Sequence, residues 1–461
     1  MTSESLALTI SVLHGWAPAT VQAITAVLVV TAIGWRSRRW RLVWVPVAII
    51  VGVAAAALSH WYVAYQGWSE DPAPLRLWLW IALTGLAAAV LVAGWRDTRW
   101  WRRGVSALAI PLSALCAALV VNQWVGYFPT ANSAWDRMTG IPLAGQTDRA
   151  AVSEMQRQGA APMQGTIVSV RIPDDASGFR HRDELVYLPP AWYATTPPPR
   201  LPVVLMLHAQ FGHPEDWVRA ADAKKTIDNF AAAHGGNAPV FVFVDSSGAF
   251  NNDTECVNGI RGNAADHITK DVVPYMISNF GVSSNPANWG IVGWSAGGTC
   301  ALTLTVKHPE LFTAFVDIDG QKGPNAGTKE QSIARLFGGD SDAWAAFDPK
   351  TIMENHGRYS GLSALFAVSR ETPNVYHSGA TAPGDVGEEP NDQANLNPVA
   401  VANYVCPLAS SHGIECAVVP HQAGHDFPSA GAIFATALPW LAGKLGTPGV
   451  PVIPLPGAPP S

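Results

Sequence analysis

The residues best suited to chemistry lie in one short stretch, residues 293–298, which reads Gly-Trp-Ser-Ala-Gly-Gly. An apolar run over 289–292 precedes this stretch, and a segment typical of a helix, 299–306, follows it. A strand, a Gly-x-Ser-x-Gly turn and a helix form a nucleophile elbow, in which a strained turn exposes the serine hydroxyl. The glycines leave room where strand and helix approach too closely for a Cβ atom. The pattern therefore predicts that Ser295 is a nucleophile.

A serine hydroxyl needs a base to accept its proton, and a third group must hold that base in place. On a sheet of the α/β-hydrolase type, the chain order is serine, acid, histidine. His421 and His425 follow the last apolar strand, and a helix over 429–441 comes after them. We select His425 as the base because Gly424 permits a tight turn there. The spacing of the two histidines also suits a metal pair on a helix, but Gly424 and the lack of a third ligand oppose that alternative.

The acid that orients the base has several candidates. Glu371 lies just past the apolar run 362–368, at the usual position, and is our first choice. The loop that follows carries four more carboxylates, of which Asp392 is the alternative acid: Asp385, Glu388, Glu389 and Asp392. Asp317 and Asp319 end the preceding strand and offer a second arrangement.

An acyl-transfer site also needs two backbone N–H groups that stabilise the developing oxyanion. The residue after the nucleophile, Ala296, supplies one of them. The loop after the strand 202–207 should supply the other, and we choose Gln210, with Phe211 as the neighbouring alternative. His208 stands at the end of that strand, where a structural, hydrogen-bonded histidine is expected.

Alternating strands and helices surround these residues from position 165 onward. An antiparallel pair over 165–173 and 184–190 comes first, and later apolar runs are typical of parallel strands buried on both faces. These runs are 202–207, 239–245, 289–294, 315–319, 362–368 and 416–420, with helical segments near 219–234, 264–280, 298–308 and 396–411. The alternation predicts an α/β fold with a doubly wound, mostly parallel sheet.

The first 128 residues differ in composition from the rest. Four apolar stretches, over 17–35, 42–65, 75–95 and 105–128, each have about the 20 residues needed to cross a bilayer core. Twelve of the 19 tryptophans lie before residue 129, which suits interfacial belts. We therefore expect a four-span transmembrane anchor over 1–128, a linker over 129–164 that is irregular apart from a short helix around 149–158, a catalytic domain over 165–445 and a disordered Pro-rich tail over 446–461.

The arginines predict an orientation for these spans. The loops between spans one and two and between spans three and four hold eight of them: Arg36, Arg38, Arg39, Arg41, Arg96, Arg99, Arg102 and Arg103. The positive-inside rule places both loops in the cytoplasm and everything after residue 128 outside. The part after residue 128 carries a net charge of −11 and no basic run, which argues against nucleic acid as a partner.

Cysteine usage fits an oxidising compartment. Cys116 lies inside a span, and the other four cysteines follow residue 128. Three pairings of four cysteines are possible. We favour Cys406 with Cys416, which would close a ten-residue loop, and Cys256 with Cys300. No C-x-x-C spacing supports zinc.

The chain resembles the esterase-D-type esterases, an α/β-hydrolase family that includes the mycolyltransferases of the actinobacterial cell envelope. The resemblance covers about 165–445 and is carried by five segments, at 187–190, 205–210, 293–298, 308–312 and 424–427. It implies a Ser–acid–His triad without a metal or other cofactor: Ser295 and His425, with Glu371 as acid and with Gln210 and Ala296 in the oxyanion hole. The four spans are similar to those of predicted membrane-anchored esterases of actinobacteria. Unlike the secreted mycolyltransferases, the chain has an anchor in place of a signal peptide and no glutamate near 397–404.

These features predict a membrane-anchored, extracytoplasmic serine esterase or acyltransferase. Its partners would be the membrane, an acyl-ester substrate and, for transfer, a sugar or glycolipid acceptor. The alternative is a catalytically inactive hydrolase fold that serves as a binding or scaffold module at the membrane surface. The intact elbow and histidine favour the enzyme.

Overall fold

The structure is a computed structural model that describes residues 10–68, 73–96, 98–159, 161–369, 389 and 397–457. It divides into two compact units, Met1–Ile141 and Pro142–Ser461. Each unit has its own packed interior, so each is described by itself.

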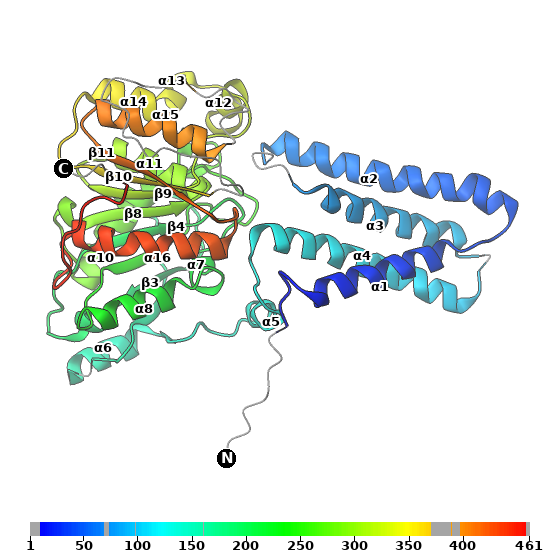
Figure 1. The fold of residues 1–461 in the computed structure, drawn as a ribbon, viewed down its shortest axis with the longest axis horizontal. Coiled ribbons are helices and arrows are strands. Elements are labelled where there is room, and N and C mark those ends of the chain that lie inside the picture. Colours follow the sequence, from blue (N-terminus) through cyan, green and yellow to red (C-terminus); the bar gives the residue numbers. More distant parts are fainter. Residues whose placement is uncertain are drawn as a thin grey trace, which may run out of the picture. The chain divides into compact units, whose positions relative to one another are not determined.

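Four long helices build the N-terminal unit (Figure 1). They are α1 (Trp16–Ile33), α2 (Val45–Gln66), α3 (Leu75–Gly94) and α4 (Trp100–Val125). A π-helical turn, η1 (Trp40–Trp44), leads directly into α2, and a short helix, α5 (Ala131–Met138), follows α4. All four are long and apolar enough to cross a membrane by length and composition. Large apolar side chains such as Val27, Ile50 and Val92 point outward, as lipid-facing residues do.

Glycines let α2 and α3 approach each other closely. A Cβ atom on Gly52 would lie 2.4 Å from the carbonyl oxygen of Ala82, and one on Gly85 would lie 2.9 Å from the Cβ of Ala55. Small residues at such contacts are typical of helices that associate within a bilayer, where burial of apolar surface gives no driving force.

Nine strands form one sheet among the described residues of the C-terminal unit. Their order is β1-β2-β3-β5-β4-β8-β9-β10-β11, and β3 runs antiparallel to both of its neighbours while the other pairings are parallel. The strands are β1 (Gln146–Thr147), β2 (Thr166–Val170), β3 (Glu184–Leu188), β4 (Val203–Leu207), β5 (Val240–Val244), β8 (Trp289–Trp294), β9 (Ala314–Ile318), β10 (Ser363–Ser369) and β11 (Glu415–His421). The predicted doubly wound α/β-hydrolase sheet is confirmed.

Helices cover both faces of this sheet (Figure 1). One face buries its apolar side chains against the helical segment η3–α10, α11 and α15, and α16 lies across β8, β9 and β10 with α8 beside it. The helices are α6 (Arg149–Gln158), α7 (Asp216–Arg219), α8 (Ala223–Ala233), α9 (Ala264–Asp266), η3 (His267–Val272), α10 (Val273–Phe280), α11 (Ala296–Lys307), α12 (Lys329–Phe337), α13 (Ser341–Ala345), α14 (Pro349–His356), α15 (Pro398–Ser411) and α16 (Phe427–Lys444). A small hairpin, β6 (Asn258–Gly259) with β7 (Gly262–Asn263), precedes α9.

Two stretches are more ordered than the sequence suggested. The expected linker contains α5 and β1 in addition to α6, the short helix predicted around 149–158, and β1 extends the edge of the sheet. The tail, expected to be disordered, is placed as far as Gly457, and its Leu455 is buried because the segment packs against the end of α16 and against β11.

Two disulfides fasten the C-terminal unit. One joins Cys256 to Cys300, and the other joins Cys406 to Cys416, which are the pairs favoured by the sequence. The first links the loop after β5 to α11, and the second links α15 to β11. Each therefore restricts a helix relative to the sheet that it covers.

A carboxyl group is buried near the end of β9. Asp317 accepts a hydrogen bond from the N–H of Gly320 at 2.7 Å, and its side chain occupies space that a Cβ atom on Gly298 would need. Burial raises the pKa of Asp317 to about 8, the N–H of Gly320 opposes the rise, and the nearby charge of Asp319 adds to it. The carboxyl group is therefore neutral at pH 7.

We expect the substitution Asp317→Asn to stabilise the protein increasingly as the pH rises. A raised folded-state pKa favours the folded state below the ordinary pKa of 3.8, and this benefit is lost as the pH rises toward 8. Asparagine mimics the neutral acid and does not titrate, so the variant should gain up to about 1.4 kcal/mol over the wild type per pH unit in that window. Unfolding midpoints at pH 5, 7 and 9 measure this difference. A difference that is independent of pH would contradict a buried neutral Asp317.

Candidate active site

The turn between β8 and α11 holds Ser295 in a strained conformation, with φ 57° and ψ −124°. A Cβ atom on Gly293 would lie 1.8 Å from the carbonyl oxygen of Gly297, so strand and helix could not meet this closely with larger residues. The N–H of Ser295 donates to the carbonyl oxygen of Ile318 at 2.8 Å, which fixes the turn against the end of β9. Ser295 itself is only half-buried. This is the geometry of a nucleophile elbow.

His425 lies beside this turn and faces a carboxylate. Its Nδ1 is 3.4 Å from Oδ2 of Asp319, and the side chains of the two residues are 32% and 1% exposed. The ring of Trp294, the residue before Ser295, lies 5.0 Å from the imidazole between centroids. Ser295, Asp319 and His425 thus follow β8, β9 and β11 at the carboxyl edge of the sheet.

Asp319 is held firmly in position. Its Oδ1 accepts a hydrogen bond from the N–H of Ser369 at 2.6 Å, and its own N–H donates to the carbonyl oxygen of Ala367 at 3.0 Å. A φ of 54° turns the backbone away from the strand at this residue. Its Oδ2 is buried and has no hydrogen-bond partner among the described residues, and the imidazole of His425 is the nearby group that can satisfy it.

The carboxylates expected to orient His425 are placed elsewhere or lie outside the described residues. Glu371 and Asp392, with Asp385 and Glu388, belong to the latter group. Glu389 instead pairs with Lys322 at 3.1 Å and with Lys350 at 2.8 Å. Among the described acids, the structure brings Asp319 to His425, which is the second arrangement offered by the sequence.

His421 is the last residue of β11, which extends one residue beyond the strand 416–420 predicted from the sequence. Burial lowers the pKa of His421, although the charge of Asp319 opposes this effect. His421 is therefore a neutral neighbour of the Asp319–His425 pair at pH 7.

The loop after β4 lies against the elbow. A Cβ atom on Gly297 would lie 2.4 Å from the carbonyl oxygen of Leu207 and 2.8 Å from that of His208. Gln210 follows in this loop, and its side-chain amide donates to Oδ2 of Asp253 at 2.8 Å. Ala296 is the first residue of α11. The two residues predicted for the oxyanion hole therefore come from neighbouring segments.

His208 has the environment of a structural histidine. It is buried, its Nδ1 donates to the carbonyl oxygen of Ala209 at 2.8 Å, and its Nε2 lies 3.4 Å from Asp245. Burial alone would raise the pKa of Asp245, but hydrogen bonds from Arg182 and His208 hold it far below its ordinary value. The contact between His208 and Asp245 links the ends of β4 and β5.

The side chains of three residues, the half-buried His181 and the buried Glu184 and His267, lie close enough together to suggest a metal site. Both ring nitrogens of His181 lie 2.8 Å from backbone carbonyl oxygens, those of Arg182 and Ile172, so both are already engaged within the protein. His267 lies 3.0 Å from Glu184 and 3.2 Å from Asp271. Burial opposes protonation of His267, but these two carboxylates raise its pKa above the ordinary value. The cluster is better described as an ion network that ties β3 to η3.

Residues 180–356 match the protein-family model described as "Putative esterase". The matched segment contains Ser295 and Asp319 and ends before His425. An uncharacterised protein of Corynebacterium glutamicum is 27% identical over 440 residues, which cover 92% of this chain and 95% of that protein. The likeness to that protein therefore extends into the N-terminal unit as well as the sheet.

Solved structures of similar arrangement include an S-formylglutathione hydrolase from Agrobacterium tumefaciens, at 16% identity and a TM-score of 0.47, covering 62% of this chain and 97% of that one. A ferulic acid esterase has 15% identity and a TM-score of 0.45, covering 61% and 99%. MPT51 of Mycobacterium tuberculosis has 17% identity and a TM-score of 0.38, covering 60% and 99%. Residues 180–356 are thus similar to an esterase family, and the sheet order is that of the α/β-hydrolase fold.

Proposed function

We propose that the protein is a membrane-anchored serine esterase or acyltransferase, with Ser295, His425 and Asp319 as its catalytic triad. One observation carries this assignment: a buried carboxylate of Asp319 faces the imidazole of His425 beside the strained Ser295 turn. The match of residues 180–356 to an esterase family supports an ester as the substrate.

In this mechanism the hydroxyl of Ser295 attacks the ester carbonyl while Nε2 of His425 accepts its proton. The imidazolium then gives the proton to the departing alcohol, and an acyl-enzyme remains. Water or a sugar hydroxyl loses a proton to His425 and attacks the acyl-enzyme, which releases a free acid or a new ester. The hydrolase and the transferase differ only in this second nucleophile.

Asp319 stabilises the imidazolium and keeps Nδ1 of His425 protonated, so that Nε2 can act as the base. Asp317 is unsuited to this role because it is neutral at pH 7 and accepts from Gly320. The N–H groups of Ala296 and of Gln210, or of Phe211 beside it, stabilise the oxyanion of the tetrahedral intermediate.

The anchor determines where this chemistry takes place. Four helices long and apolar enough to cross a membrane support anchoring, and the arginines of two alternate loops favour a site outside the cytoplasm. Two disulfides in the C-terminal unit favour the same side. Acyl esters of envelope lipids or glycolipids are the substrates that this location would bring within reach.

A fluorophosphonate probe should label the full chain and should fail to label the Ser295→Ala variant, because the probe reacts only with an activated serine. Ser278→Ala, which removes an exposed hydroxyl from α10, is the matched control and should be labelled like the wild type. A folded wild-type protein that resists the probe would favour the inactive binding module.

The substitution Asp319→Asn should lower kcat on a p-nitrophenyl acyl ester on the order of 10³- to 10⁴-fold, since the charge that stabilises the imidazolium is lost. Asp317→Asn makes the same chemical change two residues earlier and should keep most of the activity. The assignment would be wrong if Asp319→Asn stayed active while Glu371→Gln or Asp392→Asn abolished turnover.

The orientation can be tested with single cysteines in a Cys116→Ala background. A membrane-impermeant maleimide should label Asn132→Cys in intact spheroplasts and should label Ser37→Cys only after lysis. Both positions are exposed in the structure, so access depends on the side of the membrane. The reverse pattern would place the catalytic domain in the cytoplasm.

A further inference from the structure

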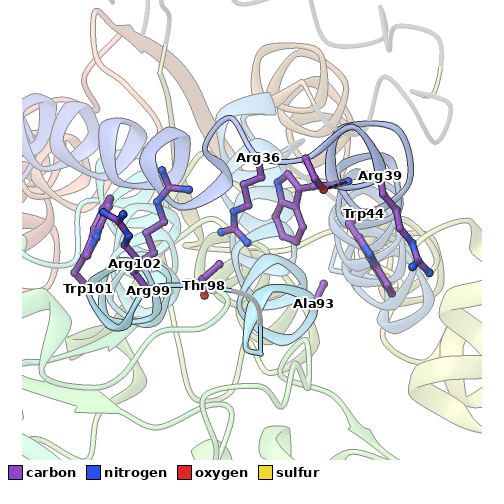
Figure 2. A pocket seen from close by; sticks show the side chains of 10 residues that line it. Arg36, Arg39, Trp44, Ala93, Thr98, Arg99, Trp101 and Arg102 are labelled. Carbon is purple, nitrogen blue, oxygen red and sulfur yellow. Dashed lines mark hydrogen bonds between the residues drawn. The ribbon is translucent and has the colours of Figure 1, made fainter.

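A basic cavity of about 690 Å³ lies in the N-terminal unit, where the two Arg-rich loops meet the helix ends (Figure 2). Four arginines and three tryptophans contribute to its lining: Arg36, Arg39, Arg99, Arg102, Trp40, Trp44 and Trp101. Among the described residues that line it there is no carboxylate. The serine mechanism does not use this site.

Arg36 is held in the wall of the cavity, and two of its guanidinium nitrogens have no hydrogen-bond partner among the described residues. Its guanidinium lies over the ring of Trp40 at 3.8 Å, and Nη2 donates to the carbonyl oxygen of Ala32 at 2.7 Å. Trp40 is itself fixed by a hydrogen bond to Ile33 at 3.0 Å. Nε and Nη1 of Arg36 are buried without a hydrogen-bond partner among the described residues. Buried donors of a cation are costly to leave unpaired, so a bound acceptor would stabilise this arrangement.

Glycines make room for the arginines. A Cβ atom on Gly94, at the end of α3, would lie 2.5 Å from Nη1 of Arg36. One on Gly34, after α1, would lie 3.1 Å from Nη1 of Arg102. Both guanidiniums thus sit against helix ends that larger residues would block, and their like charges favour an anion between the loops.

We propose that this cavity binds a phosphate group, and that the phosphate belongs to the head group of an anionic membrane lipid. Guanidinium groups match phosphate oxygens with paired hydrogen bonds, which lysine cannot reproduce. Tryptophan is typical of the membrane interface, where lipid head groups lie, and basic pockets between membrane helices bind such head groups. The volume is also well above that of a single phosphate ion.

The test measures lipid retention by the full chain. Protein purified in detergent is incubated with phosphatidylglycerol or with phosphatidylcholine, washed, and examined by native mass spectrometry. We expect retention of phosphatidylglycerol by the wild type and roughly tenfold or greater weakening in Arg36→Gln with Arg102→Gln, because two charge-assisted contacts are lost. Arg36→Lys with Arg102→Lys keeps the charge and should bind at an intermediate level, which covers the case in which the glutamine variant does not fold.

Arg38→Gln with Arg96→Gln is the matched control. It removes one charge from each of the same two loops, but both side chains are exposed and neither lines the cavity. The control should retain phosphatidylglycerol like the wild type. Equal losses in both double variants would mean that only the overall charge matters and would overturn the proposal.

A second experiment uses inorganic phosphate in place of the lipid. If phosphate binds in a way that depends on Arg36 and Arg102 but the lipid is not retained, the cavity is a phosphate site for a soluble compound and the assignment to a lipid is wrong. If neither phosphate nor phosphatidylglycerol binds, the proposal of a phosphate site is refuted.

Discussion

The close approach of β8 and α11 is the constraint on which the rest of the catalytic unit depends. Gly293, Gly297 and Gly298 lack the Cβ atoms that would strike the backbone of the helix, the end of β4 and the carboxyl of Asp317. The strain at Ser295 persists because surrounding elements are packed tightly enough to hold it. A larger residue at any one of these positions would push away the segment that its Cβ atom meets.

The same contact explains why the two acids at the end of β9 behave differently. Asp317 points into the space left by Gly298 and is kept neutral by burial, whereas Asp319 lies past a left-handed turn and faces His425. Two residues of separation thus yield a structural acid and a candidate catalytic carboxylate. A strand places alternate side chains on the same face, but the turn at Asp319 breaks that rule.

Much of the architecture could be predicted because the relevant signals are local. Buried parallel strands read as continuous apolar runs, and the elbow has a fixed spacing, so β4, β5, β8 and the position of Ser295 followed directly. The carboxylate that faces His425 could not be predicted in the same way. The loops after β9 and after β10 can both reach the same edge of the sheet, and the spacing of carboxylates along the chain does not reveal which loop brings one to the histidine. Strand β1 was not predicted because a two-residue strand is too short to show an alternation of apolar and polar side chains. The start of α4 at Trp100 was not predicted because Arg102 and Arg103 interrupt the apolar run there.

The Cys256–Cys300 bond limits how the loop after β5 can move. The loop after β5 contains Asp253, which accepts a hydrogen bond from Gln210 beside the elbow, and the bond ties this loop to the helix that begins after Ser295. A loop tethered in this way cannot swing clear like a hinged lid without displacing that helix. The conformational entropy of this loop is lost once, when the disulfide forms, and would not be lost again in each catalytic cycle. Under the proposed mechanism, selectivity would depend on the fixed shape that this loop gives to the site, and substrates that already fit would be favoured over those that must induce a fit.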